Sequence, residues 1–366
     1  MSWTLDAIDT PALVVDLNIV ERNLLRAQEA ASRRGLALWP HTKTHKIPLF
    51  AQRQMELGAR GLTVAKIGEA DVMRAAGLEH LLVHYPIVGA LKVGRLADLA
   101  SRTREVRLAV DTREAIDAAN EAARLAGREI GILVEVDTGM NRLGVVPGDE
   151  VLALARYVVD QPGLRWLGLT SFAGQISQSP DETSRRGVMK EEARALALSR
   201  EVLERAGLPP EVISVGGTHH FARLDLVEVA TEVRPGTYIY GDRATLAAGS
   251  CTEADLAARV LVTVVSRHAG WAVVDGGSKA FSSDPHREGG FGLVSGHPGW
   301  RLERFSEEHG IVTFAHEEDE GPRVGDRLEI VPNHICATVN LHDQVYGFRG
   351  TTVERVLAVE GRGRLQ

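Results

Sequence analysis

The sequence lacks the features of several common protein classes. It has two cysteines in 366 residues, Cys251 and Cys336, which are too few for a disulfide framework and predict a reduced, cytoplasmic protein. No window approaches the roughly 20 apolar residues of a membrane span, and no basic segment precedes the early apolar run as in a signal peptide. The net charge of −7 gives no reason to expect nucleic acid or an anionic membrane as a partner.

The composition, 44% hydrophobic and 25% charged, is that of an ordinary globular protein. In the first two thirds of the chain, short β-rich runs alternate with stretches that have helical spacing of Ala, Leu, Glu and Arg. The eight β-rich runs lie at residues 36–40, 61–65, 80–85, 105–111, 131–137, 165–172, 211–217 and 227–233. Such strict alternation over about 210 residues favours a (β/α)8 barrel over an open doubly wound sheet.

The pattern changes near residue 246, where predicted strands follow one another without helices and with Gly-rich connections. These strands lie at residues 259–267, 270–277, 310–316, 326–332 and 353–359. We therefore expect a barrel domain over residues 1–245, with an N-terminal strand that packs on the second domain, and an all-β domain over residues 246–366. The absence of a long linker predicts that the two domains pack closely.

Polar segments follow several predicted strands at the same end. "HTKTHK" follows the first strand, and other polar segments follow strands five to eight, at residues 136–144, 170–175, 214–220 and 234–242. The C-terminal ends of the strands are where (β/α)8 enzymes carry their active sites, and the last two loops commonly hold a phosphate. Lys43 is then a candidate functional amine, and the alternative is a solvated loop. A lysine facing a phosphate site, with an arginine between them, suggests pyridoxal phosphate bound as a Schiff base.

A second candidate site lies in the segment "NHIC". His334 and Cys336 are two residues apart on a predicted strand, so their side chains should project from one face. An imidazole and a thiolate on one face form half of a typical zinc site. The alternative is a buried thiol beside a structural histidine.

Taken in order, the motifs resemble a known family. They include "TPALVVDL" (10–17), "PHTKTHK" (40–46), "VDTGMNRLG" (136–144), "EVRPGTYIYGD" (232–242) and "PNHICATVNLHD" (332–343). With these segments the chain resembles the fold-type III pyridoxal phosphate enzymes, the alanine-racemase-like barrels. It is most similar to their D-threonine aldolase and D-serine dehydratase group, and the similarity extends from residue 10 to residue 343.

The resemblance implies roles for individual residues. Lys43 matches the lysine that binds the cofactor covalently, and Arg142 matches the arginine that hydrogen-bonds its phenolic oxygen. Arg234 has the position of the arginine that faces the ring nitrogen in alanine racemases. The remaining implied cofactor-binding residues are Ser214, Gly216, Gly217, Thr218, Gly236, Thr237 and Tyr238.

The resemblance also implies a divalent metal, zinc or manganese. The related dehydratases bind it through a His-x-Cys pair, which corresponds to His334 and Cys336, whereas the aldolases use His-x-Asp. Two protein ligands leave coordination positions open for water and substrate, as catalysis requires.

These parts together imply a lyase that acts on D-3-hydroxy-α-amino acids, as a homodimer. We prefer a D-threonine aldolase, which cleaves its substrate to glycine and an aldehyde. The alternative is a dehydratase of D-serine or D-3-hydroxyaspartate, and an amino-acid racemase is a weaker alternative because the metal pair replaces its tyrosine base. The aldolases carry a histidine after strand six, where this chain has Gln175. The base that replaces it could be a metal-bound water or one of His41, His45, His219 and His220.

Overall fold

The computed structural model describes residues 3–314 and 321–366. The chain forms two compact units, which are described separately. The barrel unit comprises residues 26–43, 48–236 and 364–366, and the β unit comprises residues up to 25, 44–47 and 237–363. The predicted domain boundary at residue 245 stays a prediction.

The barrel unit contains eight parallel strands in one sheet, in the order β2-β9-β8-β7-β6-β5-β4-β3. They are β2 (Ala37–Leu38), β3 (Leu62–Val64), β4 (His80–Val83), β5 (Glu105–Val110), β6 (Ile130–Val136), β7 (Leu164–Ser171), β8 (Val212–Gly216) and β9 (Glu232–Arg234). Seven of them lie within the predicted runs or overlap most of them, whereas the run predicted at 227–233 was wrong for residues 227–231, because the last strand begins at Glu232. The carbonyl oxygens of Leu38 and Pro40 accept hydrogen bonds from the amides of Arg60 and Thr63, which joins β2 to β3. This confirms the predicted (β/α)8 fold class.

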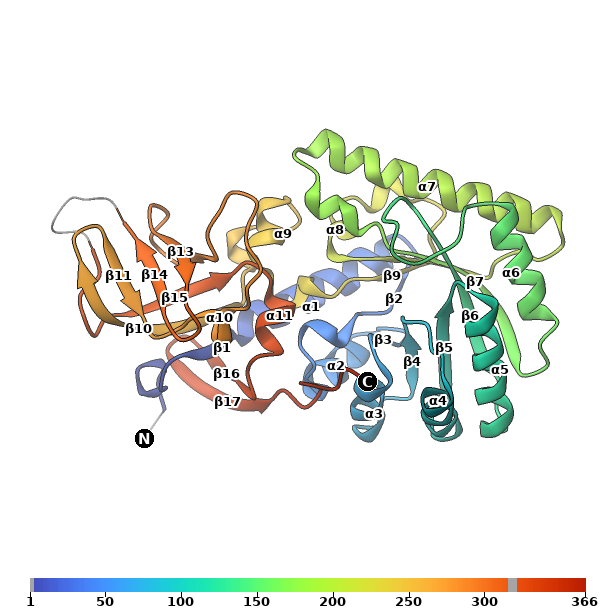
Figure 1. Ribbon diagram of the computed structural model, residues 1–366, viewed down its shortest axis with the longest axis horizontal. Helices are drawn as coiled ribbons and strands as arrows, with labels where there is room; N and C mark the ends of the chain where they lie inside the picture. The colour runs from blue at the N-terminus through green and yellow to red at the C-terminus, as the bar shows by residue number, and fades with distance from the viewer. Residues whose placement is uncertain (1–2, 315–320) are drawn as a thin grey trace. The chain divides into compact units, whose positions relative to one another are not determined.

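Helices α2 to α8 each follow a barrel strand along the chain, and α3 to α6 lie outside the sheet in Figure 1, whereas α1 precedes β2 and its residues 17–25 belong to the β unit. The helices are α1 (Leu17–Arg33), α2 (Pro48–Glu56), α3 (Ile67–Ala75), α4 (Ala90–Arg102), α5 (Arg113–Ala126), α6 (Asp149–Val159), α7 (Glu182–Arg205) and α8 (Thr218–Phe221). Helix α5 shows the local signals clearly: the Thr112 side chain accepts a hydrogen bond from the Ala115 amide, and Gly127 ends the helix at φ 63°. No helix among the residues described is both long and apolar enough to cross a membrane.

The β unit is built around a closed antiparallel barrel of six strands, because β10 pairs with both β15 and β11. In order around this barrel the strands are β10 (Ala258–His268), β15 (Arg327–Pro332), β12 (Gly292–Val294), β13 (Arg301–Phe305), β14 (Gly310–Thr313) and β11 (Trp271–Val274). The sheet continues through β1 (Ala12–Asp16), β16 (Gln344–Arg349) and β17 (Thr352–Ala358). The predicted all-β character is confirmed, with three short helices between strands: α9 (Arg243–Ala247), α10 (Ser278–Phe281) and α11 (Ile335–Val339). Residues 315 and 316 of the strand predicted at 310–316 lie outside the described residues.

The prediction that one strand carries His334 and Cys336 was wrong, because the strand ends before both residues. Strand β15 ends at Pro332, His334 precedes α11, and Cys336 lies in the first turn of that helix. The chain leaves the ladder because the amide of Ile335 donates to the buried Asp242 carboxylate, while Asn333 donates to the Asp284 and Gly290 carbonyls. Strand alternation therefore does not explain why the two side chains meet.

The interior of the parallel barrel has an apolar layer below a polar one. Trp39, Leu82, Leu133, Leu167 and Val212 form the apolar cluster. Toward the C-terminal ends of the strands, the next layer is polar: strand register pairs Glu135 with Thr170, Thr170 with Ser214, and Ser214 with Glu232. Paired residues of neighbouring strands face the same side of a sheet, so the polar groups collect inside the barrel.

Glycine is required at one point of this sheet, where the register of β6 against β7 shifts. Gly168 has φ 142°, and a Cβ atom there would lie 2.0 Å from the Val212 carbonyl oxygen. We expect Gly168→Ala to lower the free energy of unfolding by about 2–4 kcal/mol, through strain and overpacking. Gly94→Ala is the matched control, because Gly94 lies within α4 with open space around it. It should raise stability by about 0.5–1 kcal/mol. Urea unfolding measures both, and equal effects would contradict the assigned register.

Candidate functional site

Lys43 lies directly after β2, in a single 3-10 turn formed by residues Thr42–Thr44. Its Nζ lies 5.7 Å from the centroid of the Phe172 ring, and the guanidinium carbon of Arg142 lies 4.8 Å from the same centroid. The two cations therefore share one aromatic ring, which follows β7. This places the predicted amine and the predicted phenolate-binding arginine in one part of the barrel unit.

Lys46, the second lysine of the motif, has a structural role in the β unit. Its Nζ donates to Asn340 Oδ1 at 2.9 Å and to the Gly361 carbonyl at 3.4 Å, and its backbone carbonyl accepts from the Gly361 amide. The side chain is buried, and the residue has φ 56°. Lys46 therefore anchors the C-terminal segment, which leaves Lys43 as the candidate functional amine of the pair.

His84, which follows β4, shows where cations converge in the barrel unit. Burial lowers its pKa well below 6.5, and the charges of Arg234, Lys43 and Arg142 lower it further. Its Nε2 lies 3.0 Å from Thr170 Oγ1. The imidazole is therefore neutral at physiological pH, and its surroundings oppose protonation. The three cations around it would attract a ligand with several negative charges.

Arg234 is fixed by two hydrogen bonds at the end of β9. It donates from Nη1 to Ser214 Oγ at 2.6 Å and from Nη2 to the Ser171 carbonyl at 2.7 Å. Burial lowers its pKa to about 10, against the opposing charges of Glu135, Glu232 and Glu192. Arg234 thus stays charged at neutral pH, because three carboxylates surround it.

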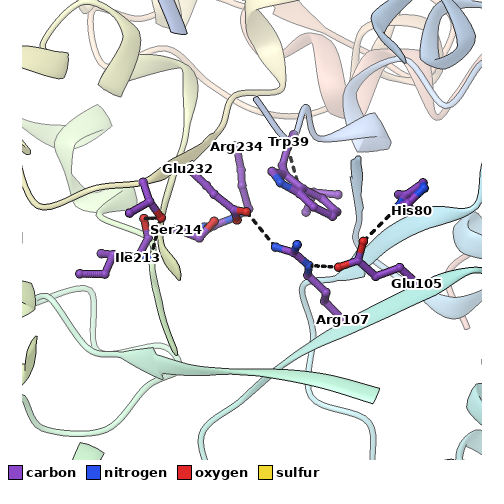
Figure 2. Close-up of polar contacts among 10 residues, drawn as sticks. Trp39, His80, Glu105, Arg107, Ile213, Ser214, Glu232 and Arg234 are labelled. Carbon is purple, nitrogen blue, oxygen red and sulfur yellow. Dashed lines mark hydrogen bonds and ion pairs between the residues drawn. The ribbon is translucent and has the colours of Figure 1, made fainter. Parts of the chain in front are cut away.

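Ion pairs connect Glu232, which lies beside Arg234 on β9, to Arg107 and Glu105 of β5, as Figure 2 shows. Arg107 donates to Glu232 at 2.8 Å and to Glu105 at 2.7 Å, and its guanidinium carbon lies 4.1 Å from the Trp39 ring centroid. Glu232 and Arg234 are two apart on β9, so both side chains face the barrel interior. Arg107 therefore supplies the partner that lets Glu232 be buried beside Arg234.

Glu135 is a buried carboxylate in the middle of an apolar strand. Its Oε2 atom is buried without a hydrogen-bond partner among the described residues. Burial raises its pKa to about 7, although the charges of Arg234 and Arg142 act in the opposite direction. Glu135 can therefore exchange a proton near neutral pH within the same cationic region.

A glycine turn follows β8 beside these groups. A Cβ atom at Gly216 would lie 2.9 Å from both Arg234 Nη2 and Phe172 Cδ2, and Gly217 has φ 103°. Thr218 begins helix α8 directly after Gly217. The predicted residues Ser214, Gly216, Gly217 and Thr218 thus lie along one segment beside Arg234. Gly236 follows β9 in the same unit, whereas Thr237 and Tyr238 belong to the β unit.

In the β unit, His334 and Cys336 interact with each other. A hydrogen bond with Cys336 raises the pKa of His334 to about 9, against the effect of burial, and the charges of Cys336, Asp242 and Asp284 add to the increase. The His334 Nδ1 atom lies 3.1 Å from Asp284 Oδ2.

The Cys336 sulfur has two hydroxyl neighbours within the β unit. It lies 3.2 Å from Thr44 Oγ1 and 3.7 Å from Thr237 Oγ1. No cluster of three or more His, Cys, Asp or Glu side chains suited to a metal occurs in the part of the chain that the structure describes. The site therefore offers two candidate ligands, the imidazole of His334 and the sulfur of Cys336.

The histidines suggested as bases have different environments. The Nδ1 atoms of His41 and His45 accept backbone hydrogen bonds, and His220 is bound to Glu192. Burial, followed by the charge of His220, lowers the pKa of His219 to about 4. Gln175 donates to the Thr138 carbonyl at 2.8 Å.

Sequence reasoning missed His84, Glu135 and Phe172. The sequence signal that could have identified His84 and Glu135 is a polar residue within each of two apolar runs, "LLVHY" and "GILVEV".

Comparison with known proteins gives the following matches. The family "Alanine racemase, N-terminal domain" matches residues 15–244, and "Putative serine dehydratase domain" matches residues 257–348. The chain is 34% identical to a D-threonine aldolase of Arthrobacter sp, over 97% of this chain and 93% of that protein. It is also 34% identical to the D-threo-3-hydroxyaspartate dehydratase of Delftia sp., over 92% of this chain and 93% of that one.

Solved structures agree with these matches. The crystal structure of D-threonine aldolase from Filomicrobium marinum has a TM-score of 0.94 and 35% identity, covering 100% of this chain and 99% of that one. A cysteine-to-alanine variant of D-threo-3-hydroxyaspartate dehydratase, solved in the metal-free form, has a TM-score of 0.88 and 32% identity, covering 97% and 98%. The resemblance inferred from the motifs is confirmed, and these relatives are lyases, the expected class.

The raised pKa of Glu135 makes stability depend on pH. The folded protein holds this proton up to a pKa of about 7, whereas the unfolded carboxyl releases it near 4.5. Between about pH 5 and pH 8 the folded state therefore loses stability relative to the unfolded state as pH rises. We expect Glu135→Gln to remove this loss, so that the variant gains roughly 2–3 kcal/mol relative to the parent over that interval. Chemical unfolding of both ligand-free proteins at several pH values measures it, and a pH-independent difference would contradict the buried acid.

Proposed function

Since the chain belongs to the alanine racemase N-terminal domain family, we propose that it is a lyase that uses pyridoxal phosphate and a divalent metal on D-3-hydroxy-α-amino acids. The preferred activity is that of a D-threonine aldolase, which cleaves D-threonine to glycine and acetaldehyde. The observation that carries the proposal is the cationic region around His84, formed by Lys43, Arg142 and Arg234 beside the glycine turn. A cofactor with a phosphate, a phenolate and an aldehyde needs these groups.

The residues of the barrel unit fit pyridoxal phosphate. Lys43 supplies the amine for the covalent bond, Arg142 would hold the phenolic oxygen, and the turn at Gly216 and Gly217 allows close approach of a phosphate. Arg234 would face the ring nitrogen; because it stays charged, it would keep that nitrogen unprotonated. Ser214, Thr218, Gly236, Thr237 and Tyr238 complete the proposed binding set. When bound, the cofactor supplies stabilisation of negative charge at the substrate Cα atom.

The pair His334 and Cys336 fits a divalent metal that prefers nitrogen and sulfur ligands, such as zinc. Manganese remains the second candidate. The metal-free form of the dehydratase variant that lacks a cysteine supports a role for Cys336. Asp284 would orient His334 through Nδ1, as carboxylates commonly orient metal-bound histidines. The metal would act as a Lewis acid on the β-hydroxyl group of the substrate.

In the proposed reaction, the lysine and the metal act on the same substrate. Thr44 follows Lys43 directly in the chain, and its hydroxyl lies 3.2 Å from the Cys336 sulfur. A substrate bound through its amino group at Lys43 carries its β-hydroxyl only two carbon atoms away. The carboxyl of Glu135, whose pKa burial raises to about 7, would then hold or move a proton near the substrate, and the neutral imidazole of His84 would offer a hydrogen bond.

The second candidate function is a dehydratase of D-serine or D-3-hydroxyaspartate. It is favoured by the His-x-Cys pair and by the 34% identical dehydratase. In that reaction Lys43 would take the Cα proton and the β-hydroxyl would leave as hydroxide, whereas in the aldolase reaction the Cα–Cβ bond breaks. A homodimer and a cytoplasmic location complete the proposal.

The proposed role of Lys43 predicts a selective covalent label. Borohydride reduction of the purified protein should fix the cofactor to Lys43, and peptide mass mapping should find it there. Lys43→Ala should abolish the visible absorbance of the cofactor. Lys46→Met is the control, because Lys46 is held by Asn340 and Gly361 and should affect stability rather than absorbance. A label on Lys46 or Lys279 would contradict the assignment.

Product analysis decides between the two activities. We expect D-threonine to yield glycine and acetaldehyde without ammonia when zinc or manganese is supplied. A dehydratase would instead convert D-serine to pyruvate and ammonia, and D-threonine to 2-oxobutyrate and ammonia. A preference for L-substrates would contradict both activities.

The same assay tests the metal pair. Cys336→Ala should lose metal and at least about 100-fold in activity, whereas Cys251→Ala should retain both, because Cys251 is not in the proposed site. Unchanged metal content in Cys336→Ala would contradict the site.

A further inference from the structure

A fully buried carboxylate–imidazole pair lies beside the glycine turn and has no role in the mechanism above. Glu192 of α7 contacts His220 of α8 through Oε2 and Nε2 at 2.7 Å, and the two side chains are 0% and 1% exposed. The other oxygen of Glu192 accepts a hydrogen bond from Ser171 Oγ at 2.7 Å. The carboxylate is thus fixed from two sides, and the imidazole ring is fixed with it.

The opposite edge of the imidazole ring faces the turn. A Cβ atom at Gly217 would lie 3.3 Å from His220 Nδ1 and 3.8 Å from Cε1. This Nδ1 atom is buried, and it has no hydrogen-bond partner among the described residues. A side chain on Gly217 would contact this edge of the ring, whereas glycine places no side chain against it.

A purely structural histidine does not explain this arrangement. A buried ring nitrogen that makes no hydrogen bond is unfavourable, and such atoms are rare in folded proteins. A second group that completes the pairing is therefore expected at the turn.

We propose that His220, oriented by Glu192, donates a hydrogen bond from Nδ1 to a phosphate monoester bound at the Gly217 turn. This inference rests on the proposed function, in which the phosphate belongs to the cofactor. Nε2–H is donated to the Glu192 carboxylate, so Nδ1 can donate when the ring carries a second proton. A phosphate bound at Nδ1 would favour that charged form, because opposite charges attract.

The same network reaches Arg234. Ser171, which donates to Glu192, also accepts a hydrogen bond from Arg234 through its carbonyl oxygen at 2.7 Å. One strand residue therefore connects the histidine at the phosphate end with the arginine proposed at the ring nitrogen. Glu192 is a positioning residue for both.

The test compares ligands that differ by the phosphate alone. His220→Gln should weaken binding of pyridoxal phosphate to the apoprotein by about tenfold to a hundredfold, as expected for a charge-assisted hydrogen bond, and leave binding of pyridoxal unchanged. Inorganic phosphate should lose affinity by a similar factor. Glu192→Gln should act in the same direction. His80→Gln is the matched control, because His80 forms a similar pair with Glu105 at 2.9 Å on a different strand. It should change none of these affinities.

The proposal is overturned if His220→Gln leaves the affinity for pyridoxal phosphate unchanged, or if it weakens pyridoxal and pyridoxal phosphate equally. A parent protein that binds inorganic phosphate through His220 but not pyridoxal phosphate would support the histidine and reject the cofactor.

A measurement on the unmodified protein covers the case in which a variant does not fold. Nitrogen-15 NMR should show both ring nitrogens of His220 protonated when phosphate or pyridoxal phosphate saturates the protein. A His220 signal that does not respond to either ligand would overturn the proposal.

Discussion

Burial of Arg234 inside the parallel barrel is the constraint on which the proposed site depends. A guanidinium cannot be removed from water without compensation, because its charge loses solvation. Compensation comes from Glu135, Glu232 and Glu192, and Glu232 in turn requires Arg107. The polar layer above the apolar cluster is therefore one connected group of arginine and glutamate side chains.

The positive charges in this layer affect two neighbouring titratable groups. Burial keeps His84 neutral, and the charges of Arg234, Lys43 and Arg142 add to this effect. Glu135 stays close to its titration point, because burial and the nearby arginines act in opposite directions. A neutral imidazole and a titrating carboxyl thus lie among cations that would attract a phosphorylated ligand.

The β unit provides a different kind of chemistry. A hydrogen bond with Cys336 raises the pKa of His334 to about 9, and a metal that binds both side chains would displace their protons. Their approach arises from a turn after β15 that is held by Asp242 and Asn333. Both proposed activities would use the same lysine, cofactor and metal. The reaction would then depend on which substrate bond is aligned for cleavage.

The sequence by itself determined the eight-fold alternation of strand and helix, the strand-rich second part, and the motifs around Lys43, Arg142 and His334. These features are local, because periodicity and turn residues act over a few positions. Only the tertiary structure decided that Lys46 anchors the C-terminal segment, that His334 and Cys336 meet through a helix start, and that His84, Glu135 and Glu192 lie near Arg234, with His220 bound to Glu192. Burial and charge compensation arise between residues far apart in the chain, and no local pattern records them.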